Sequence, residues 1–367
     1  MDGHGFWNRV GFVPVVMLGF FASALGAPVP VVLSTNSPVR IMAANLTGNS
    51  QRYEPFAARI FQGLKPDIVA IQEFNVGNNS PAEVRQFVDA AFGPAFQYFR
   101  EAGAQIPNGV ISRWPIVASG EWADPQVSNR DFVWARLDIP GPHDLHVVSV
   151  HLHSGGGPSS RKLEADSLKS RIAAAFPGGA YVVLAGDFNF DTRSEAAMTV
   201  FKTFLVDDPV PVDGRGDPDT NNGRSKPYDY VLTSANWRTN LIPTQLGASS
   251  PVFPSGLVFD SRVYSPLSAV APVQSADSGN AQHMAVVKDF SVRHSVTNFI
   301  ELTSPKLDWS GTELRWNSPG GITWRIELST NFSQWTTIGT ASSAGTGGTF
   351  RPAGDLPQPA LLRVVYP

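Results

Sequence analysis

The sequence contains no cysteine among its 367 residues. Disulfides, thiolate-bound zinc and cysteine nucleophiles are therefore excluded. Any bound metal must be held by oxygen or imidazole ligands. A site rich in carboxylates favours Mg²⁺, with Mn²⁺ or Ca²⁺ as alternatives.

A basic excess is also missing. The 28 Lys and Arg residues are balanced by 31 Asp and Glu, so the formal net charge is -3. Proteins that coat long duplex DNA neutralise its phosphates with a basic face. The charge balance therefore argues against non-specific coating of DNA. A local basic patch is still compatible with it.

Long apolar runs are scarce, and the main one lies at the start of the chain. Arg9 precedes an apolar run over 10–24, and small residues follow it at 22–27. This is the layout of a secretory signal peptide, and the run is shorter than the ~20 residues that a spanning helix needs. We expect 1–27 to be a signal peptide and the protein to be secreted, periplasmic or in the cell envelope.

The rest of the chain is rich in turns and in apolar strands. It has 33 Gly, 30 Pro and 42% hydrophobic residues, which favours a strand-rich architecture over a helical bundle. Capping boxes at Ser80–Glu83 and Thr192–Glu195 predict helix starts. We expect helices at 51–64, 81–92, 161–176 and 192–205, and strands at 39–46, 67–74, 109–117, 132–139, 145–152, 181–185, 228–233 and 284–290.

The composition changes near residue 300, which predicts a main domain at 36–293 and a small β-sandwich accessory domain at 300–367. Strands at 314–316 and 322–326 flank a Ser-Pro-Gly-Gly turn, the pattern of a β-hairpin. Four Trp in this region either fill a small core, which we favour, or form a platform for a glycan or the cell envelope. These are Trp309, Trp316, Trp324 and Trp335.

Polar residues suited to phosphate chemistry follow several apolar strands. Phosphodiester hydrolysis needs a metal that neutralises the phosphate, a polarised water and a stabilised leaving oxygen. Acidic, amide and imidazole side chains at strand ends can supply these functions. Taken singly, each is more typical of a structural strand end. The first three are Asn45, Glu73 and His151.

The sharpest motif is Gly186-Asp187-Phe188-Asn189, at the end of a continuous apolar strand. Alternation along the strand puts Asp187 and Asn189 on one face and Phe188 on the other. The Asp could accept a hydrogen bond from an attacking water, and the Asn could donate one to a phosphate oxygen. A structural turn with an Asx motif is the alternative.

Asp229 lies within an aromatic and aliphatic strand, where a carboxylate is costly unless it is paired. His283 opens the last predicted strand and is a natural partner. An Asp–His pair fixes the imidazole tautomer and raises its basicity. Taken without Asp229, His283 could instead be a structural histidine of the core whose hydrogen bonds are all made within the protein.

Basic residues give weaker indications. The segment 207–227 is polar and reads as a long loop, and loops of that length are often functional. At its end, Arg224 and Lys226 could meet a phosphate, although exposed loop charges are more often solvated. Arg113, in a Ser-Arg-Trp-Pro turn, could brace the substrate.

Seven motifs together resemble the endonuclease/exonuclease/phosphatase superfamily, in the order typical of that family and over residues 39–292. No single motif is decisive, but seven in order make chance a poor explanation. They are Met42-Ala43-Ala44-Asn45-Leu46, Ile71-Gln72-Glu73, Gly109 to Ile116, Val150-His151-Leu152-His153, Gly186-Asp187-Phe188-Asn189, Tyr228 to Leu232 and Gln282 to Val286.

The resemblance implies an α+β fold, a four-layer α/β/β/α sandwich with two mixed sheets between helices. It implies Glu73 as the main Mg²⁺ ligand with Asn45 beside the metal, and Asp187 as the residue that orients or deprotonates the water. It leaves open whether Asp187 or His283 is the base. The remaining implied roles are phosphate contact for His151 and Asn189 and a dyad of Asp229 and His283.

One position departs from the family pattern. The family usually has Asp directly before the last His, and this sequence has Gln282. Its amide oxygen can coordinate a metal but brings no charge. Asp277 could substitute if the chain turns back after it, so metal affinity or metal choice could differ from the family norm.

We therefore expect an exported, monomeric, Mg²⁺-dependent phosphodiesterase that uses in-line water attack, first of all a nuclease acting on DNA or RNA. A sphingomyelinase or inositol-phosphate phosphoesterase is the nearest alternative, weakened by the lack of a long apolar hairpin. A weakly catalytic binding protein that works through 300–367 is the other, and only Gln282 supports it.

Overall fold

The computed structural model describes residues 29–300, 307–309, 313–317, 320–331, 333–344, 347–357 and 360–365. The expected signal peptide at 1–27 lies outside these residues. The chain divides into two compact units, one of residues 36–294 and one that includes the described residues from 295 onward. The larger unit holds every residue with a predicted chemical role.

The first sheet of the larger unit is mixed and has the strand order β10-β12-β1-β2-β4-β3, with β11 paired to β12. β1 and β2 run parallel, whereas β2 and β4 are antiparallel. Its strands are β1 (Val29–Ala44), β2 (Ile68–Ile71), β3 (Gln97–Arg100), β4 (Gly109–Ser112), β10 (Leu241–Ile242), β11 (Leu257–Phe259) and β12 (Ala285–Ile300).

The second sheet has the sequential order β5-β6-β7-β8-β9. β7 and β8 are parallel, and their neighbours are antiparallel. All seven residues of β7 are buried, as expected for a strand covered on both faces. The strands are β5 (Ile116–Trp122), β6 (Phe132–Leu137), β7 (Leu145–His151), β8 (Tyr181–Asp187) and β9 (Asp229–Thr233).

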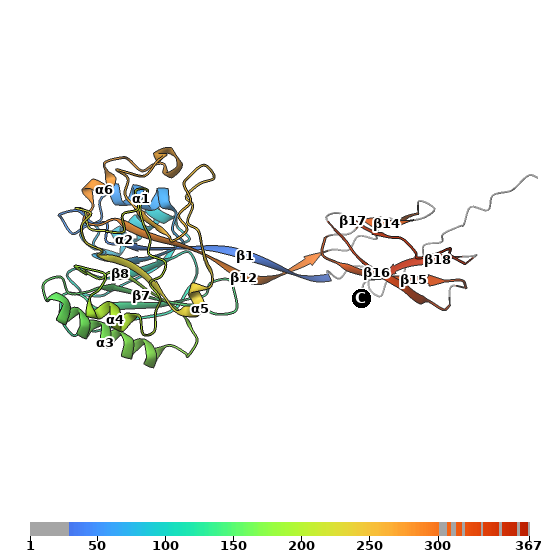
Figure 1. The fold of residues 1–367 in the computed structure, drawn as a ribbon, viewed down its shortest axis with the longest axis horizontal. Coiled ribbons are helices and arrows are strands. Elements are labelled where there is room, and N and C mark those ends of the chain that lie inside the picture. Colours follow the sequence, from blue (N-terminus) through green and yellow to red (C-terminus); the bar gives the residue numbers. More distant parts are fainter. Residues whose placement is uncertain are drawn as a thin grey trace, which may run out of the picture. The chain divides into compact units, whose positions relative to one another are not determined.

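The larger unit has few helices in its described residues. Figure 1 shows α1, α2 and α6 on one side of the unit and α3 and α4 on the other. Within the described residues, no helix is both long and apolar enough to cross a membrane. The helices are α1 (Pro55–Leu64), α2 (Pro81–Phe92), α3 (Gly157–Ala175), α4 (Ala196–Phe201), α5 (Ala235–Arg238), α6 (Asp277–Asn280) and the 3₁₀ turn η1 (Leu267–Val270).

Three hydrophobic clusters hold this unit together. One joins the facing sides of the two sheets through residues such as Ile41 and Val147. A second packs α1 and α2 against the first sheet, and a third packs α3 and α4 against the second sheet. The alternation of side chains along each strand supplies two apolar faces per sheet. The unit is thus a mixed α+β structure with few helices.

Of the two capping boxes predicted to start helices, the one at Ser80 is confirmed and the one at Thr192 is wrong. Ser80 caps α2, and both hydrogen bonds of its box with Glu83 are present. Thr192 does not cap a helix, because α4 begins only at Ala196. The Glu195 carboxylate instead accepts two hydrogen bonds from Arg161, at 2.8 and 2.6 Å.

The single strand predicted at 109–117 is wrong, because β4 ends at Ser112 and β5 begins at Ile116. The break contains Pro115, which has no amide hydrogen for a sheet ladder. The two strands belong to different sheets. The turn between them therefore carries the chain from the first sheet to the second.

The smaller unit contains two three-stranded sheets, β13-β14-β17 and β16-β15-β18. The hairpin predicted across 318–321 is wrong, since β14 and β15 belong to different sheets. Trp316 and Trp324 are buried in one apolar cluster, as a small core requires, and Trp335 is half-buried. The strands are β13 (Leu307–Trp309), β14 (Leu314–Asn317), β15 (Thr323–Ser329), β16 (Thr336–Ser342), β17 (Gly347–Phe350) and β18 (Leu361–Val365).

Candidate functional site

The strand ends place the predicted polar residues at one rim of the two sheets. In the first sheet, Ala44 pairs with Ile71 in parallel register, so Asn45 and Glu73 leave the same edge. In the second sheet, His151 pairs with Asp187, and Asp187 with Asp229. His283 lies just before β12 and reaches the same rim.

Asp187 lies at the centre of this cluster and is 1% exposed. Asn45 Nδ2 donates a hydrogen bond to Asp187 Oδ2 at 3.0 Å. His151 Nε2 lies 3.3 Å from the same oxygen. Asn45 follows β1 of the first sheet, and His151 is the last residue of β7 in the second, so Asp187 links the two sheets at the rim.

Glu73 is buried, with 3% of its surface exposed. Its carboxylate accepts hydrogen bonds from Thr47 Oγ1 at 2.6 Å, Gln282 Nε2 at 3.2 Å and Asn45 Nδ2 at 3.5 Å. All three donors are neutral. Its backbone φ of 50° is in the left-handed region, which a residue with a Cβ rarely adopts. Such strain is commonly found at functional sites.

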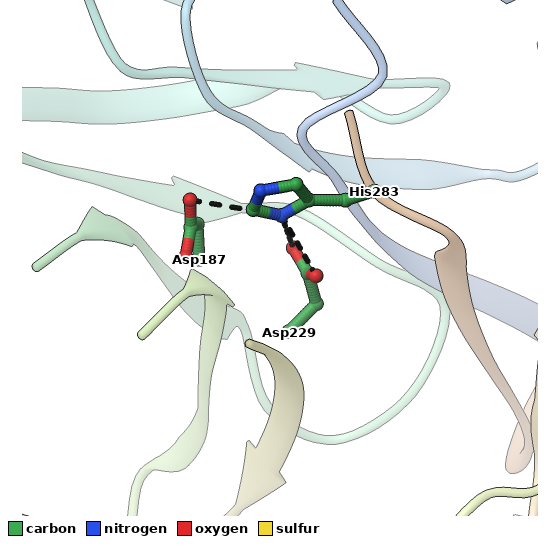
Figure 2. Close-up of side chains that lie close together, drawn as sticks. All are labelled: Asp187, Asp229 and His283. Atoms are coloured by element: carbon green, nitrogen blue, oxygen red, sulfur yellow. Dashed lines mark hydrogen bonds and ion pairs between the residues drawn. The ribbon is translucent and has the colours of Figure 1, made fainter. Parts of the chain in front are cut away.

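Asp229 and His283 form a hydrogen-bonded dyad, with His283 Nδ1 2.9 Å from Asp229 Oδ2 (Figure 2). Thr220 Oγ1 donates to the same carboxylate at 2.7 Å. His283 Nδ1 is also 3.7 Å from Asp187 Oδ2. The dyad orients the imidazole and fixes which ring nitrogen carries the hydrogen bond.

The buried cluster shifts the pKa values of three side chains. Burial lowers the pKa of His283, but the carboxylates of Asp229 and Asp187 outweigh it and raise that pKa to about 9. Burial raises the pKa of Asp187 to about 6, against the opposing effect of His283. Burial, followed by the charge of Arg130, lowers the pKa of His151 well below its usual value. At neutral pH the site thus contains one charged and one neutral imidazole.

Asn189 lies beyond the end of β8, with a φ of 53°. Its backbone amide donates to Asp187 Oδ1 at 2.9 Å, and its side-chain amide donates to the carbonyl of Leu152, also at 2.9 Å. Phe188 is buried in the cluster against α3 and α4. Strand alternation does not extend to Asn189, because β8 ends at Asp187, and the bond from the Asn189 amide to Asp187 is the Asx hydrogen bond of the structural alternative. Asn189 therefore ties the ends of β7 and β8 together beside Asp187.

Three further residues complete the rim and were not predicted. Thr47 and Thr220 hydrogen-bond the carboxylates of Glu73 and Asp229. Arg130 is 5% exposed and donates to the carbonyls of His151 and Leu152 at 2.5 and 2.8 Å. Thr47 lies two residues after Asn45, a spacing that points it to the same face. The other two carry no comparable pattern in the sequence.

Two predicted residues lie away from the cluster. The Asp277 carboxylate is bound by Arg59, at 3.1 and 2.6 Å, rather than placed beside Glu73. Arg113 pairs with Asp67, which precedes β2, whereas Glu73 follows it. About six residues of extended chain separate these two ends, on the order of 20 Å. The predicted roles of Asp277 at the metal and Arg113 at the substrate are therefore wrong.

The prediction for Arg224 is also wrong. Its guanidinium makes ion pairs with Asp213, Asp217 and Asp260 at 2.9, 3.3 and 3.2 Å, and its side chain is 13% exposed. Three carboxylates leave it no charge for a substrate phosphate, and it instead holds the 207–227 loop to the body of the unit.

Lys226 remains at the rim of the site. Its side chain is 42% exposed and its Nζ lies 2.6 Å from Asp191, two residues after Asn189. An exposed pair of this kind contributes little to stability. The Lys226 ammonium can therefore bind a substrate phosphate only if the phosphate replaces Asp191 as its partner.

An open hollow of about 560 Å³ lies beside His283. We call it the amide-lined hollow, because five of its lining residues are Asn or Gln. It is lined by Asn49, Asn221, Asn222, Gly223, Tyr228, Gly279, Asn280, Ala281, Gln282 and His283.

The cluster offers oxygen ligands for a divalent metal. Ligand atoms of Asp187, Asp229 and His283 lie within 4.8 Å of one another. Glu73 adds a buried carboxylate that makes no ion pair with any cation in the described part of the chain. A buried charge is costly unless it is paired or binds a metal. The donor set of carboxylate and amide oxygens therefore fits a hard divalent cation.

Comparison with known proteins identifies a family whose model matches more than half of this chain. The model of the Endonuclease/Exonuclease/phosphatase family matches residues 42–250. No curated protein matches the chain at a significant level. Among solved structures, an endonuclease/exonuclease/phosphatase from Beutenbergia cavernae DSM 12333 is similar with a TM-score of 0.48 and 17% identity, covering 89% of this chain and 95% of its own.

Two other solved structures of lower coverage are similar. D. rerio TDP2 in complex with a single-strand DNA product has a TM-score of 0.46 and 17% identity, over 69% of this chain and 99% of its own. The human Nocturnin catalytic domain with a bound sulfate anion has a TM-score of 0.44 and 15% identity, over 73% and 98%.

Proposed function

This chain belongs to the endonuclease/exonuclease/phosphatase family, and from that premise we propose that it is an exported, Mg²⁺-dependent phosphodiesterase, first of all a nuclease. The proposal includes the four-layer α/β/β/α arrangement, which the three separate hydrophobic clusters of the larger unit support. Export rests on the signal-peptide pattern of residues 1–27.

One observation carries the proposal. Glu73 is a buried carboxylate whose hydrogen bonds all come from neutral groups, next to a second buried carboxylate, Asp187. Asp187 has the charged imidazole of His283 at 3.7 Å, but no cation of the described residues pairs with Glu73, and an unpaired buried carboxylate is costly in a folded protein. Glu73 and the amide oxygen of Asn45 would hold the metal, which neutralises phosphate charge and polarises water when bound.

The side chains divide the remaining work. Asp187, ionised above about pH 6, accepts a hydrogen bond from the attacking water and orients it. His283 keeps its proton up to about pH 9, and its Nε2 makes no hydrogen bond within the described residues. That nitrogen can donate to a phosphate oxygen and stabilise negative charge in the transition state. Asp229 holds the ring in place. We assign contact with the substrate phosphate to His151 and Asn189, which flank Asp187.

The test uses the purified full chain on bis(p-nitrophenyl) phosphate and on single-stranded DNA, with Mg²⁺ and then with EDTA. We expect hydrolysis that EDTA abolishes and added Mg²⁺ restores. Glu73→Gln should lower kcat/KM at least ~100-fold, or about 2.7 kcal/mol of transition-state stabilisation. The exposed Glu121→Gln is the matched control. Full activity of Glu73→Gln, or activity that survives EDTA, would contradict the proposal.

A further inference from the structure

We propose that the amide-lined hollow is a subsite for a nucleobase next to the scissile phosphate, so that this enzyme recognises the nucleoside as well as the phosphodiester. This inference rests on the proposed function, because the hollow borders the same site through His283. It narrows the substrate class to nucleotides and distinguishes among the alternatives that the sequence leaves open.

The first argument is the charge of the lining. Apart from His283, which belongs to the catalytic cluster, no lining residue is acidic or basic. The other lining residues are Asn and Gln amides, two Gly, one Ala and one Tyr. A polyphosphorylated ring would need free cations in such a place, and a choline group would need an anion or an aromatic cage. An uncharged, polar ring needs neither.

Basic residues near the hollow already have partners. Arg262 donates to the carbonyl of Asn222 and pairs with Asp260 at 2.8 Å. Lys226 pairs with Asp191 at 2.6 Å. Each cation is thus matched by a carboxylate, so the surroundings of the hollow add little positive charge for a second phosphate.

Tyr228 supplies an aromatic surface at the boundary between the hollow and the catalytic cluster. Its ring is half-buried and its centroid lies 5.2 Å from that of His283. Lys226 Nζ is 5.8 Å from the same ring. Stacking of a base on an aromatic side chain contributes about 1–3 kcal/mol. A base bound here would extend directly from a phosphate held at His283.

Some amide side chains of the hollow are held by hydrogen bonds within the protein, and others are available to a ligand. Asn222 Nδ2 donates to the carbonyls of Gly279 and Ala281, which ties the 207–227 loop to the α6 region. Asn49 and Asn280 are exposed, and no hydrogen bond of the described residues engages either side chain. Each offers a donor and an acceptor, which is the pattern needed to read the edge of a base.

The dimensions agree with this occupant. A volume of about 560 Å³ is within the roughly 300–1,000 Å³ typical of small-molecule sites. The hollow is open to solvent, so a base can enter while its strand continues outside. Because Lys226 and Arg262 are paired with carboxylates, the site suits a short or single-stranded substrate better than a long duplex.

Inhibition of bis(p-nitrophenyl) phosphate hydrolysis tests the proposal without a nucleic-acid substrate. Thymidine 5′-monophosphate is compared with ribose 5-phosphate, phosphocholine and inositol 1,4,5-trisphosphate. We expect the nucleotide to inhibit at least ten-fold more strongly than each of the others. Equal inhibition by ribose 5-phosphate, or stronger inhibition by either headgroup, would overturn the subsite.

Variants of Tyr228 and Asn280 test whether the preference for the nucleotide originates in the hollow. Tyr228→Leu and Asn280→Ala should each reduce the ratio of nucleotide to ribose 5-phosphate inhibition by three-fold or more, whereas Tyr228→Phe, which keeps the ring, should preserve it. An unchanged ratio in both Tyr228→Leu and Asn280→Ala would overturn the assignment.

The two proposals can fail separately. Metal-dependent hydrolysis without nucleotide preference leaves the phosphodiesterase standing and overturns the subsite. Absence of hydrolysis contradicts the phosphodiesterase, and calorimetric titration of thymidine 5′-monophosphate into the wild type and Tyr228→Leu then decides on the subsite. Binding at least ten-fold tighter to the wild type would support it, and equal binding would overturn it.

Discussion

The side-chain amide nitrogen of Gln282 lies within hydrogen-bond distance of three acceptors, Thr47 Oγ1, the carbonyl of Gly48 and Glu73 Oε2, at 2.9, 2.9 and 3.2 Å, and its two hydrogens are shared among them. A carboxylate in the same position would lose these donors and would place a second negative charge beside Glu73. Gln282 therefore stabilises the site in the absence of a metal. It also lacks the negative charge with which an Asp would attract a cation.

We predict that Gln282→Asp lowers the melting temperature in EDTA by a few degrees, because two neighbouring carboxylates repel each other. Its affinity for Mg²⁺ should rise about ten-fold, which corresponds to about 1.4 kcal/mol. Calorimetric titration and thermal unfolding with and without Mg²⁺ measure both effects. The exposed Gln105→Asp serves as control, and an unchanged Mg²⁺ affinity in Gln282→Asp would contradict the prediction.

A second residue-scale prediction concerns Glu164, which is 0% exposed and lies against Asp124. Burial, followed by the Asp124 carboxylate, raises the pKa of Glu164 to about 9 from a usual value of 4.5. The folded protein therefore binds a proton that the unfolded chain releases. Its contribution to stability is present below about pH 4.5 and is lost as the pH rises toward about 9.

Glu164→Gln keeps a neutral group in that position, so its free energy of unfolding should fall less between pH 6 and pH 9. The expected gain at pH 9 is a few degrees in melting temperature, at about 2–4 °C per kcal/mol for a unit of this size. Asp166→Asn, on the same helix and in an exposed pair with Lys162, is the control. Equal pH dependence of Glu164→Gln and the wild type would refute this assignment.

At the scale of elements, helix α2 depends on its N-terminal cap. The Ser80 side chain accepts a hydrogen bond from the Glu83 amide at 3.3 Å, and Glu83 accepts one from the Ser80 amide at 3.1 Å. α2 then buries Val84 and Val88 against the first sheet. The cap fixes the start of the helix, and the apolar side chains fix its face.

Ser80→Ala should reduce the free energy of unfolding by about 1 kcal/mol, since it leaves a backbone amide without its partner. Urea unfolding followed by circular dichroism measures the change. Ser80→Asp retains an acceptor and should unfold within about 0.5 kcal/mol of the wild type. If both variants lose the same amount, the cap is not the cause.

At the scale of the whole molecule, all residues of the candidate site lie within 36–294, and the smaller unit has an apolar cluster of its own. We therefore expect a chain truncated to 29–300 to keep its kcat/KM on a small diester within about two-fold. Loss of activity with intact secondary structure would show that the smaller unit contributes to the site.

The same truncation tests the alternative in which the smaller unit contacts a glycan or the cell envelope. Trp335 is half-buried, and Arg363 lies over its ring at 4.2 Å, so this aromatic surface is already partly covered. If the unit contacts the cell envelope or a glycan, the full chain should sediment with envelope fragments and the truncated chain should not. Equal sedimentation of both would contradict that role.

Local pattern predicted much of the larger unit. Apolar runs predicted most of the central strands, and the polar residues at their ends predicted Glu73, Asp187 and His283 as neighbours, which the structure brings to one rim. This works because a strand carries its end residue to a sheet edge whatever the rest of the chain does. The mixture of α and β elements follows from the same local patterns.

Tertiary structure alone decided which charges are paired. Arg224 and Asp277 resemble site residues in the sequence, but Asp260 and Arg59, 36 and 218 residues away, bind them. It also decided that β14 and β15 join different sheets, although their turn is typical of a hairpin. Ion pairs and sheet partners depend on contacts between distant segments, which form only when the whole core packs and which no short stretch of sequence specifies.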